Sequence, residues 1–401
     1  MNTRVPYHAH ADGAPSWPLG TPCFDDRIGR TFRTVVLQPT SLCNLDCVYC
    51  YLPTRKRRYE MPPTVAEAAA ASIAEQATEH GHEPTAEPVD VVWHGGEPTA
   101  MPILRFGERL QVFEDLRRTG QVRHAIQTNA TLIDHAWCEL FRDYRFEVGV
   151  SIDGPAAANL NRADWSGHPV FDRIMRGIGM LRRYQIPFSV ICVVSPQTIT
   201  APEALMTFFD QLGCTQVGFN IEEYEGVNTR IPVDITAAET FWRSVLAHQI
   251  GHHRGTASRL PVREIDQLGA YLAQARNGRK EEWTKAKHDP IPTIAWNGDT
   301  VLMSPELLGI DAPEHHDFVV GNVLHQSLPT MLRRAHQVGY VRELLHGLDN
   351  CQASCAFFDF CRGAHAGNRY YEHGTFAATE TAHCRNTRQA LVNAFANTIK
   401  E

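Results

Sequence analysis

The chain has 401 residues, a length typical of two or three domains. Its 45 acidic residues outnumber its 38 lysines and arginines, and this net charge of −7, without a basic stripe, excludes nucleic acid as an expected partner. No apolar run reaches the roughly 20 residues that cross a bilayer, and the N-terminus lacks the apolar core of a signal peptide. We therefore expect a cytoplasmic protein with no membrane partner.

Six strand–helix units follow an irregular arm at residues 1–30, which is rich in Pro, Gly, His and Ala. The strands are expected at 34–39, 89–93, 122–127, 146–151, 187–194 and 215–221. The helices are expected at 64–79, 102–118, 134–142, 168–184, 201–212 and 235–252. Repeated β-α units give parallel strands with right-handed crossovers, so the pattern predicts an α/β barrel or open sheet over residues 31–255. In such folds the active site lies at the carboxyl ends of the strands.

A different pattern begins after about residue 255, where we expect a second domain at 256–401. The Asn297-Gly298 pair is a typical two-residue hairpin turn between apolar runs. The elements expected before the last group of cysteines are a helix at 263–276, a hairpin at 291–303 and a helix at 328–347.

Most of the 11 cysteines gather at two places, which favours metal centres in a reducing compartment over disulfides. The scattered ones are Cys23, Cys138, Cys192 and Cys214. Cys192 lies inside an apolar run, so we expect it in the hydrophobic core.

The first group is Cys43, Cys47 and Cys50, in the pattern C-x3-C-x2-C directly after the first predicted strand. Three thiolates can hold three irons of a [4Fe-4S] cluster and leave the fourth iron open to another ligand. A zinc site and a disulfide are the alternatives. Zinc usually takes four ligands in two pairs, and no second pair lies close by in the sequence.

The triplet, with Tyr49 just before its last cysteine, resembles the signature of the radical S-adenosylmethionine superfamily. After the second predicted strand, Gly95-Gly96-Glu97-Pro98 looks like the loop that binds the methionine amino group in that family. The glycines fit this role because they let backbone approach a ligand closely. The resemblance implies a partial (βα)6 barrel, S-adenosylmethionine bound to the open iron, and an external one-electron donor.

Polar residues also follow the third and fourth predicted strands, where the equivalent positions of the resembling family bond the ribose hydroxyls and the methionine carboxylate. A valine on the fifth strand is predicted to contact the adenine. Turn or helix-cap roles are the alternatives for the polar residues, and core packing is the alternative for the valine. The predicted cofactor-binding residues are Gln127, Asn129, Ser151, Asp153, Arg162 and Val193.

The second group of cysteines resembles the SPASM extension of peptide-modifying radical enzymes. That extension commonly carries two auxiliary clusters, but here the hairpin around Gly298 has no cysteine and position 365 is histidine. We therefore expect one auxiliary [4Fe-4S] cluster, with a structural zinc as the alternative, and we expect His365 to be a packed or supporting residue. The predicted auxiliary ligands are Cys351, Cys355, Cys361 and Cys384.

Three segments, at 219–228, 262–264 and 361–381, resemble the cyclophane-forming radical SAM/SPASM maturases of ribosomal peptides. Such enzymes join an aromatic ring carbon to the β-carbon of a residue two positions later in a precursor peptide. The resemblance covers about residues 33–390.

Three carboxylates of the first of these segments, Glu222, Glu223 and Glu225, are predicted to be catalytic. Ring closure releases a proton and an electron, and a nearby carboxylate could take the proton while the auxiliary cluster takes the electron. The alternative for these carboxylates is ion pairing with Arg263 or Arg230.

Two other functions compete with peptide cyclisation. One is another radical SAM/SPASM modification, either formylglycine formation on a sulfatase or thioether formation. The other is a non-catalytic iron–sulfur or zinc scaffold, which would leave residues 95–98 and 151–153 without a role.

Overall fold

The computed structural model of the protein describes residues 24–79, 87–230, 232–253 and 259–400. Cys23, most of the predicted arm at 1–30 and the predicted boundary at residues 255 and 256 lie outside these residues. The division of the chain into an arm and two domains therefore stays a prediction. The described part begins with the short helix α1 (Phe24–Arg27).

Nine strands form one sheet in the order β6-β5-β4-β3-β2-β1-β7-β8-β9. The first six are parallel and adjacent in chain order: β1 (Thr34–Leu37), β2 (Val89–Trp93), β3 (Val122–Thr128), β4 (Glu147–Ser151), β5 (Phe188–Val194) and β6 (Val217–Ile221). Strands β6 and β9 are the edges, so the sheet does not close on itself. The predicted partial (βα)6 barrel is confirmed, with strand bounds within two residues of those expected from the sequence.

The predicted hairpin extends the sheet on its other side. Strand β7 (Thr293–Ile294) pairs parallel with β1, and β8 (Asp299–Val301) and β9 (Gly321–Asn322) continue antiparallel. Gly298 closes the turn with φ of +90°, a conformation that favours glycine. The C-terminal region therefore begins as a direct continuation of the barrel sheet.

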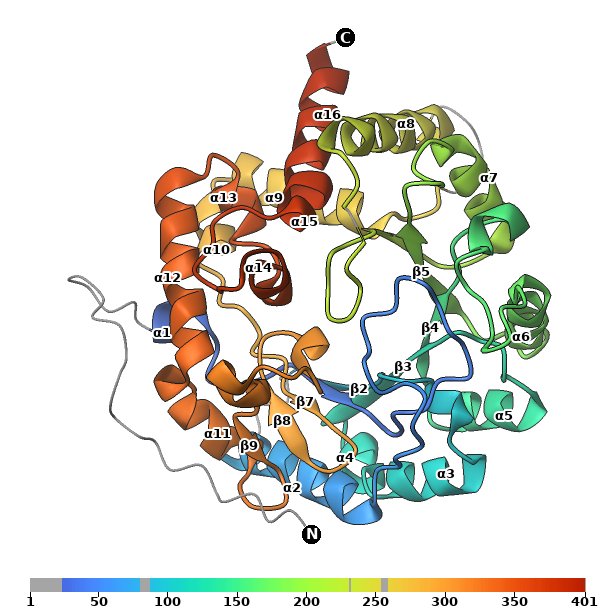
Figure 1. Ribbon diagram of the computed structural model, residues 1–401, viewed down its shortest axis with the longest axis vertical. Coiled ribbons are helices and arrows are strands. Elements are labelled where there is room, and N and C mark those ends of the chain that lie inside the picture. The colour runs from blue at the N-terminus through green and yellow to red at the C-terminus, as the bar shows by residue number, and fades with distance from the viewer. Residues whose placement is uncertain (1–23, 80–86, 231, 254–258, 401) are drawn as a thin grey trace.

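Helices surround the parallel strands as an outer ring (Figure 1). They are α2 (Pro63–Glu79), α3 (Ile103–Gln111), α4 (Glu114–Arg118), α5 (His135–Asp143), α6 (Phe171–Arg183), α7 (Pro202–Leu212) and α8 (Ile235–His253). The core lies between this ring and the sheet, as in the contact of Trp93 with Phe106, whose ring centroids are 4.9 Å apart. Cys192 is fully buried in this core, as expected from its apolar surroundings.

Two predicted helices are broken. The helix expected at 102–118 is interrupted between α3 and α4, where the fully buried Phe113 packs edge-on against Trp93 and leaves helical geometry. The helix expected at 328–347 ends and restarts around Val338, which is extended and precedes Gly339. Core packing and local backbone preference override the helical period at these points.

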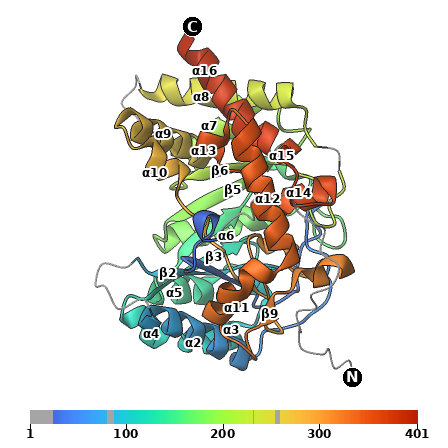
Figure 2. The same ribbon diagram turned by 90° about the vertical axis from the view of Figure 1, so that its left-hand side faces the viewer.

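The C-terminal region is mainly helical and closes over the side of the barrel. Its helices are α9 (Arg263–Arg276), α10 (Lys280–Thr284), α11 (Leu328–Arg334), α12 (Gly339–Ser354), α13 (Phe358–Cys361), α14 (Ala366–His373), α15 (Ala382–Cys384) and α16 (Ala390–Lys400). Figure 2 shows α12 in front of the sheet, with α16 at the top across α8 and α11 at the bottom near α2. Helix α16 packs along α8, and Trp242 of α8 donates a hydrogen bond to the carbonyl of Asn386 at 2.8 Å. None of the helices in the described part of the chain is both long and apolar enough to cross a bilayer.

Candidate active site

The first cysteine group lies on the loop that follows β1. Several backbone contacts hold this loop: the N–H of Cys43 donates to the carbonyl of Arg55 at 2.9 Å, and the indole of Trp165 donates to the carbonyl of Cys43 at 2.9 Å. Cys47 is buried, and Cys43 and Cys50 are partly buried. These contacts therefore fix the conformation of the loop that bears the three cysteines at the carboxyl end of the sheet.

The sulfurs of both cysteine groups are spaced more widely than the four ligands of a single zinc ion would be. Four thiolates at about 2.3 Å from one zinc would lie about 3.8 Å apart. In the described part of the chain, no three cysteine sulfurs lie within 4.8 Å of one another. Burial raises the pKa of Cys47 to about 12 and also raises the pKa of Cys43 and Cys50, so positively charged iron must offset this burial for the thiolates to form.

The glycine loop after β2 packs directly on the cysteine loop. Gly95 and Gly96 have φ of +88° and +69°, and a Cβ at Gly96 would lie 2.5 Å from the carbonyl oxygen of Thr40. The N–H of Glu97 donates to the carbonyl of Leu42 at 2.8 Å. The two predicted cofactor motifs, far apart in the chain, are therefore joined in one wall of the site.

Glu97 is a buried carboxylate that organises the end of β3. Its oxygens accept hydrogen bonds from the N–H of Thr99 at 3.0 Å, the hydroxyl of Thr128 at 2.6 Å and the N–H of Asn129 at 2.7 Å. Burial raises the pKa of Glu97, while these hydrogen bonds lower it. The side chain of Asn129 then donates to Asn44 on the cysteine loop at 2.9 Å, which brings this predicted residue beside the cluster site. Pro98 is buried and begins the next short turn.

Asp153 is the centre of a second buried network. Its carboxylate accepts two hydrogen bonds from Arg162, at 2.9 and 3.0 Å, one from the hydroxyl of Tyr49 and one from the N–H of Val193 at 2.9 Å. Asp153 and Arg162 are 1% and 5% exposed. All acceptor positions of the carboxylate are engaged, so in the structure Asp153 positions these three predicted residues.

Gln127 and Ser151 meet between β3 and β4, where the Gln127 amide donates to the Ser151 hydroxyl at 2.8 Å. Gly149 makes room for this contact, because a Cβ there would lie 2.2 Å from the Gln127 side-chain oxygen. Sequence reasoning missed Gly149, although an isolated glycine inside a strand is a signal of close approach.

The four cysteines of the second group line one pocket between α12, α13 and α15, together with His365, Arg369 and Arg388. Arg369 is 2% exposed and donates to the sulfur of Cys351 at 3.2 Å, and the N–H of Thr381 donates to the sulfur of Cys384 at 3.3 Å. Burial raises the pKa of Cys384 to about 11. The pocket therefore supplies four thiols together with cationic and N–H donors that stabilise thiolates, and Arg369 is a supporting residue that the sequence did not reveal.

The three predicted catalytic glutamates occupy three different surroundings. Glu222 forms an ion pair with Arg230 at 3.0 Å, as the alternative interpretation expected, and burial raises its pKa against the lowering effect of Arg230. Arg263 pairs instead with Glu264 at 2.5 Å.

Glu223 contacts the C-terminal region. Its carboxylate lies 2.9 Å from Nδ1 of His383 and accepts a hydrogen bond from Asn368 at 2.5 Å. Burial acts to raise its pKa, but His383 and His365 outweigh burial and the pKa lies below its usual value.

Glu225 faces the carboxylate of Glu306 and the ring of His365, and burial together with Glu306 raises its pKa well above the usual value. His365 also forms an ion pair with Glu306 at 3.7 Å. Sequence reasoning missed Glu306, since no local pattern marks it.

The family is shown by comparison with known proteins. The model of the radical SAM superfamily matches residues 37–209. An uncharacterized protein of Synechocystis is 30% identical over 92% of each chain, and the serine-type anaerobic sulfatase-maturating enzyme of Bacteroides thetaiotaomicron is 25% identical over 84% of this chain and 83% of its own. The chain belongs to the radical SAM superfamily. This radical SAM enzyme therefore uses a [4Fe-4S] cluster and S-adenosylmethionine.

Solved structures support the fold of this radical SAM enzyme over nearly its whole length. Native anSMEcpe with bound AdoMet superimposes with a TM-score of 0.74 at 20% identity, over 92% of this chain and 98% of its own. SuiB of Streptococcus suis, bound to S-adenosylmethionine, superimposes with a TM-score of 0.63 at 18% identity, over 90% of this chain and 79% of its own. The fold similarity extends through the C-terminal region that carries the second cysteine group.

Proposed function

We propose that this enzyme cross-links a ribosomally made precursor peptide, joining an aromatic ring carbon to the β-carbon of the residue two positions on. The main support is that the three segments resembling cyclophane-forming maturases meet in space. Arg263 donates to the side chain of Asn220 at 2.7 Å, and Asn368 donates to Glu223. The segment 219–228 thus contacts both 262–264, which runs beside β6, and 361–381, which reaches the loop after β6.

A peptide substrate is also supported by the structural relatives. Structures exist of anSMEcpe with the Cp18Cys peptide and of SuiB with the precursor peptide SuiA. Both superimpose on this chain over about 90% of its length, with TM-scores of 0.73 and 0.63.

In this proposal Cys43, Cys47 and Cys50 hold the cluster that binds S-adenosylmethionine, and the residues of the Glu97 and Asp153 networks hold the cofactor in one pose. The second cysteine group holds a single auxiliary cluster. When bound, the first cluster and S-adenosylmethionine supply a 5′-deoxyadenosyl radical, after one electron arrives from an external donor.

The reaction balances as a two-hydrogen oxidation of the peptide. One hydrogen atom passes from the β-carbon to the 5′-deoxyadenosyl radical, which becomes 5′-deoxyadenosine. A carbon–carbon bond then forms to the ring, and the ring carbon loses a proton and an electron. We assign the proton to Glu222, because its side chain is 3% exposed, lies at the end of β6 and has a pKa raised by burial, which suits a general base. An auxiliary cluster held by Cys351, Cys355, Cys361 and Cys384 would accept the electron.

The mass and fragmentation of the peptide product test this proposal. Anaerobically reconstituted enzyme, dithionite, S-adenosylmethionine and a candidate precursor peptide should give a peptide lighter by two hydrogens per ring. Tandem mass spectrometry should show no cleavage inside the three-residue ring, and deuterium at the acceptor β-carbon should appear in 5′-deoxyadenosine. Enzyme with Cys43, Cys47 and Cys50 all changed to Ala is the control and should release no 5′-deoxyadenosine.

Formylglycine formation is the second candidate, because curated relatives at 25% and 28% identity are named sulfatase-maturating enzymes. Under that function a Cys or Ser of a sulfatase peptide would become an aldehyde without any ring. An aldehyde product or a sulfur-linked product would contradict the cyclophane proposal.

A further inference from the structure

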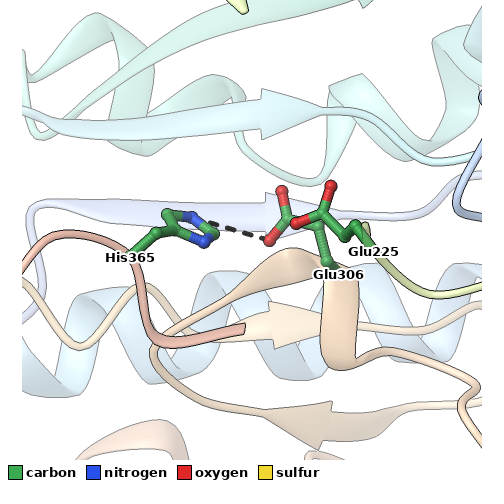
Figure 3. A group of neighbouring side chains, drawn as sticks. All are labelled: Glu225, Glu306 and His365. Carbon is green, nitrogen blue, oxygen red and sulfur yellow. Dashed lines mark ion pairs between the residues drawn. The ribbon is translucent and has the colours of Figure 1, made fainter. Parts of the chain in front are cut away.

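Three metal-ligating side chains from distant parts of the chain converge beside the proposed peptide site. Glu225 lies on the loop after β6, Glu306 on a short turn after β8 (Pro305–Leu307) and His365 just before α14. One ligand atom of each lies within 4.8 Å of the other two. Figure 3 shows the two carboxylates side by side, with the His365 ring facing Glu306 from the other side.

The charges of this group are not balanced by the surrounding protein. Among the described residues, no lysine or arginine forms an ion pair with Glu225 or Glu306, and no side chain donates a hydrogen bond to the Glu225 carboxylate. Glu306 accepts one hydrogen bond, from the hydroxyl of Ser304 at 2.6 Å. Two partly buried carboxylates that face each other repel, and a cation between them would remove this repulsion.

The imidazole of His365 gives an independent indication of a ligand. Its Nδ1 atom is buried and has no hydrogen-bond partner in the described part of the chain, while Nε2 lies 3.7 Å from Glu306, too far for a hydrogen bond. Buried ring nitrogens are normally satisfied. The nitrogen that faces Glu306 is Nε2, and a half-turn of the ring exchanges it with Nδ1, so an ion beside Glu306 would be a partner for the nitrogen that lacks one.

The donor set indicates the class of ion. Carboxylate oxygen and imidazole nitrogen bind Mn²⁺, Fe²⁺ or Zn²⁺ at about 2.0–2.2 Å, which places ligand atoms about 3–4 Å apart. The observed spread of at most 4.8 Å therefore needs only small side-chain rotations to close on one ion. Thiolate sulfur, which characterises the two cluster sites, does not contribute to this group.

We propose that Glu225, Glu306 and His365 bind one divalent metal ion, of the class of Mn²⁺, Fe²⁺ or Zn²⁺, separate from the iron–sulfur clusters. The ion connects the barrel loop after β6 to the turn after β8 and to the segment that also lines the auxiliary-cluster pocket. It thereby holds together the two parts of the molecule that border the peptide site. This proposal does not depend on the identity of the peptide product.

Manganese is the probe, because Mn²⁺ prefers oxygen and nitrogen donors to the cysteines. Chelator-treated holoenzyme with both clusters intact is titrated anaerobically with Mn²⁺, and the free ion is counted by its electron paramagnetic resonance signal. We expect saturation at one Mn²⁺ per chain and a rise in the unfolding temperature on binding. Glu225→Gln, Glu306→Gln and His365→Gln should each weaken binding at least tenfold.

Glu314→Gln is the matched control, since Glu314 is a carboxylate outside this group that accepts a hydrogen bond from Tyr370, and the change should leave Mn²⁺ affinity unchanged. Iron and sulfide content equal to wild type shows that each variant is folded. Pulsed electron paramagnetic resonance of Mn²⁺ bound to the wild-type enzyme should show coupling to an imidazole nitrogen, and the His365→Gln variant should lack this coupling. Absence of saturable binding, absence of that coupling, or Mn²⁺ affinity equal to wild type in all three site variants would overturn the proposal, whatever the outcome of the peptide assay.

Discussion

Glu222, Glu223 and Glu225 lie within four residues of one another, yet each meets a different partner. Glu222 pairs with Arg230, Glu223 with His383 and Asn368, and Glu225 faces Glu306. Burial raises the pKa of Glu222 against the effect of Arg230, burial and Glu306 raise that of Glu225, and His383 and His365 outweigh burial to lower that of Glu223. At this scale, the surroundings of each carboxylate, and not its residue type, decide whether it can serve as a base.

Glu222→Gln should separate cofactor cleavage from ring formation. The amide keeps the size of the side chain but cannot accept the proton, so we expect 5′-deoxyadenosine release within about twofold of wild type and ring formation reduced about 10²–10⁴-fold. Because burial raises the pKa of Glu222, wild-type ring formation should fall as the pH drops through that pKa and the carboxylate becomes protonated. Mass spectrometry of the peptide against pH, with 5′-deoxyadenosine counted in the same samples, measures both. Unchanged ring formation in the variant would exclude Glu222 as the base.

At the scale of elements, the contact between helix α6 and strand β3 shows how the fold positions the predicted cofactor residue Asn129. Helix α6 approaches the carboxyl end of β3 so closely that a Cβ at Gly177 would lie 1.9 Å from the carbonyl oxygen of Ala130, the residue after Asn129. Gly179, on the exposed side of the same helix, has nothing within 4 Å of its Cβ position. The helix therefore supports the Asn129 turn directly through backbone contact at one glycine.

Gly177→Ala and Gly179→Ala form a matched pair on this helix. The first should destabilise the protein by about 1–3 kcal/mol through overpacking, and should weaken S-adenosylmethionine binding by displacing the Asn129 turn. The second should stabilise it by about 0.5–1 kcal/mol, because alanine loses less backbone entropy than glycine in a helix. Denaturant unfolding and cofactor titration of both variants test this, and equal effects at the two positions would show that α6 does not press on the turn.

At the scale of the whole molecule, the open edge of the sheet determines how the C-terminal region docks. The hairpin extends the sheet beyond β1, α11 packs against α2, and α16 packs along α8. Buried side chains form one continuous core through both parts. The second cysteine group and the Glu225 loop are brought to one side of the barrel by this docking, which neither part could achieve alone.

The whole enzyme should contain about eight irons, four in each of two cubane clusters. This follows from seven cysteines in two groups, with no cysteine in the hairpin around Gly298 and histidine at position 365. Iron and sulfide analysis with Mössbauer quantitation of reconstituted protein measures the number. About twelve irons would show that other residues ligate a third cluster, and zinc in place of iron at the second group would contradict the auxiliary cluster.

The sequence by itself determined the six strand–helix units, the hairpin and both cysteine groups, because periodicity, turn chemistry and ligand spacing are local properties of the chain. The helix breaks at Phe113 and Val338 emerged only from the tertiary structure. The first of them arises because Phe113 packs into the core. The network around Asp153, the role of Arg369 and the meeting of Glu225 with Glu306 and His365 also emerged only from the folded chain. These groups lie far apart in sequence, and their contacts depend on how crossovers and the C-terminal region pack, which no local pattern encodes.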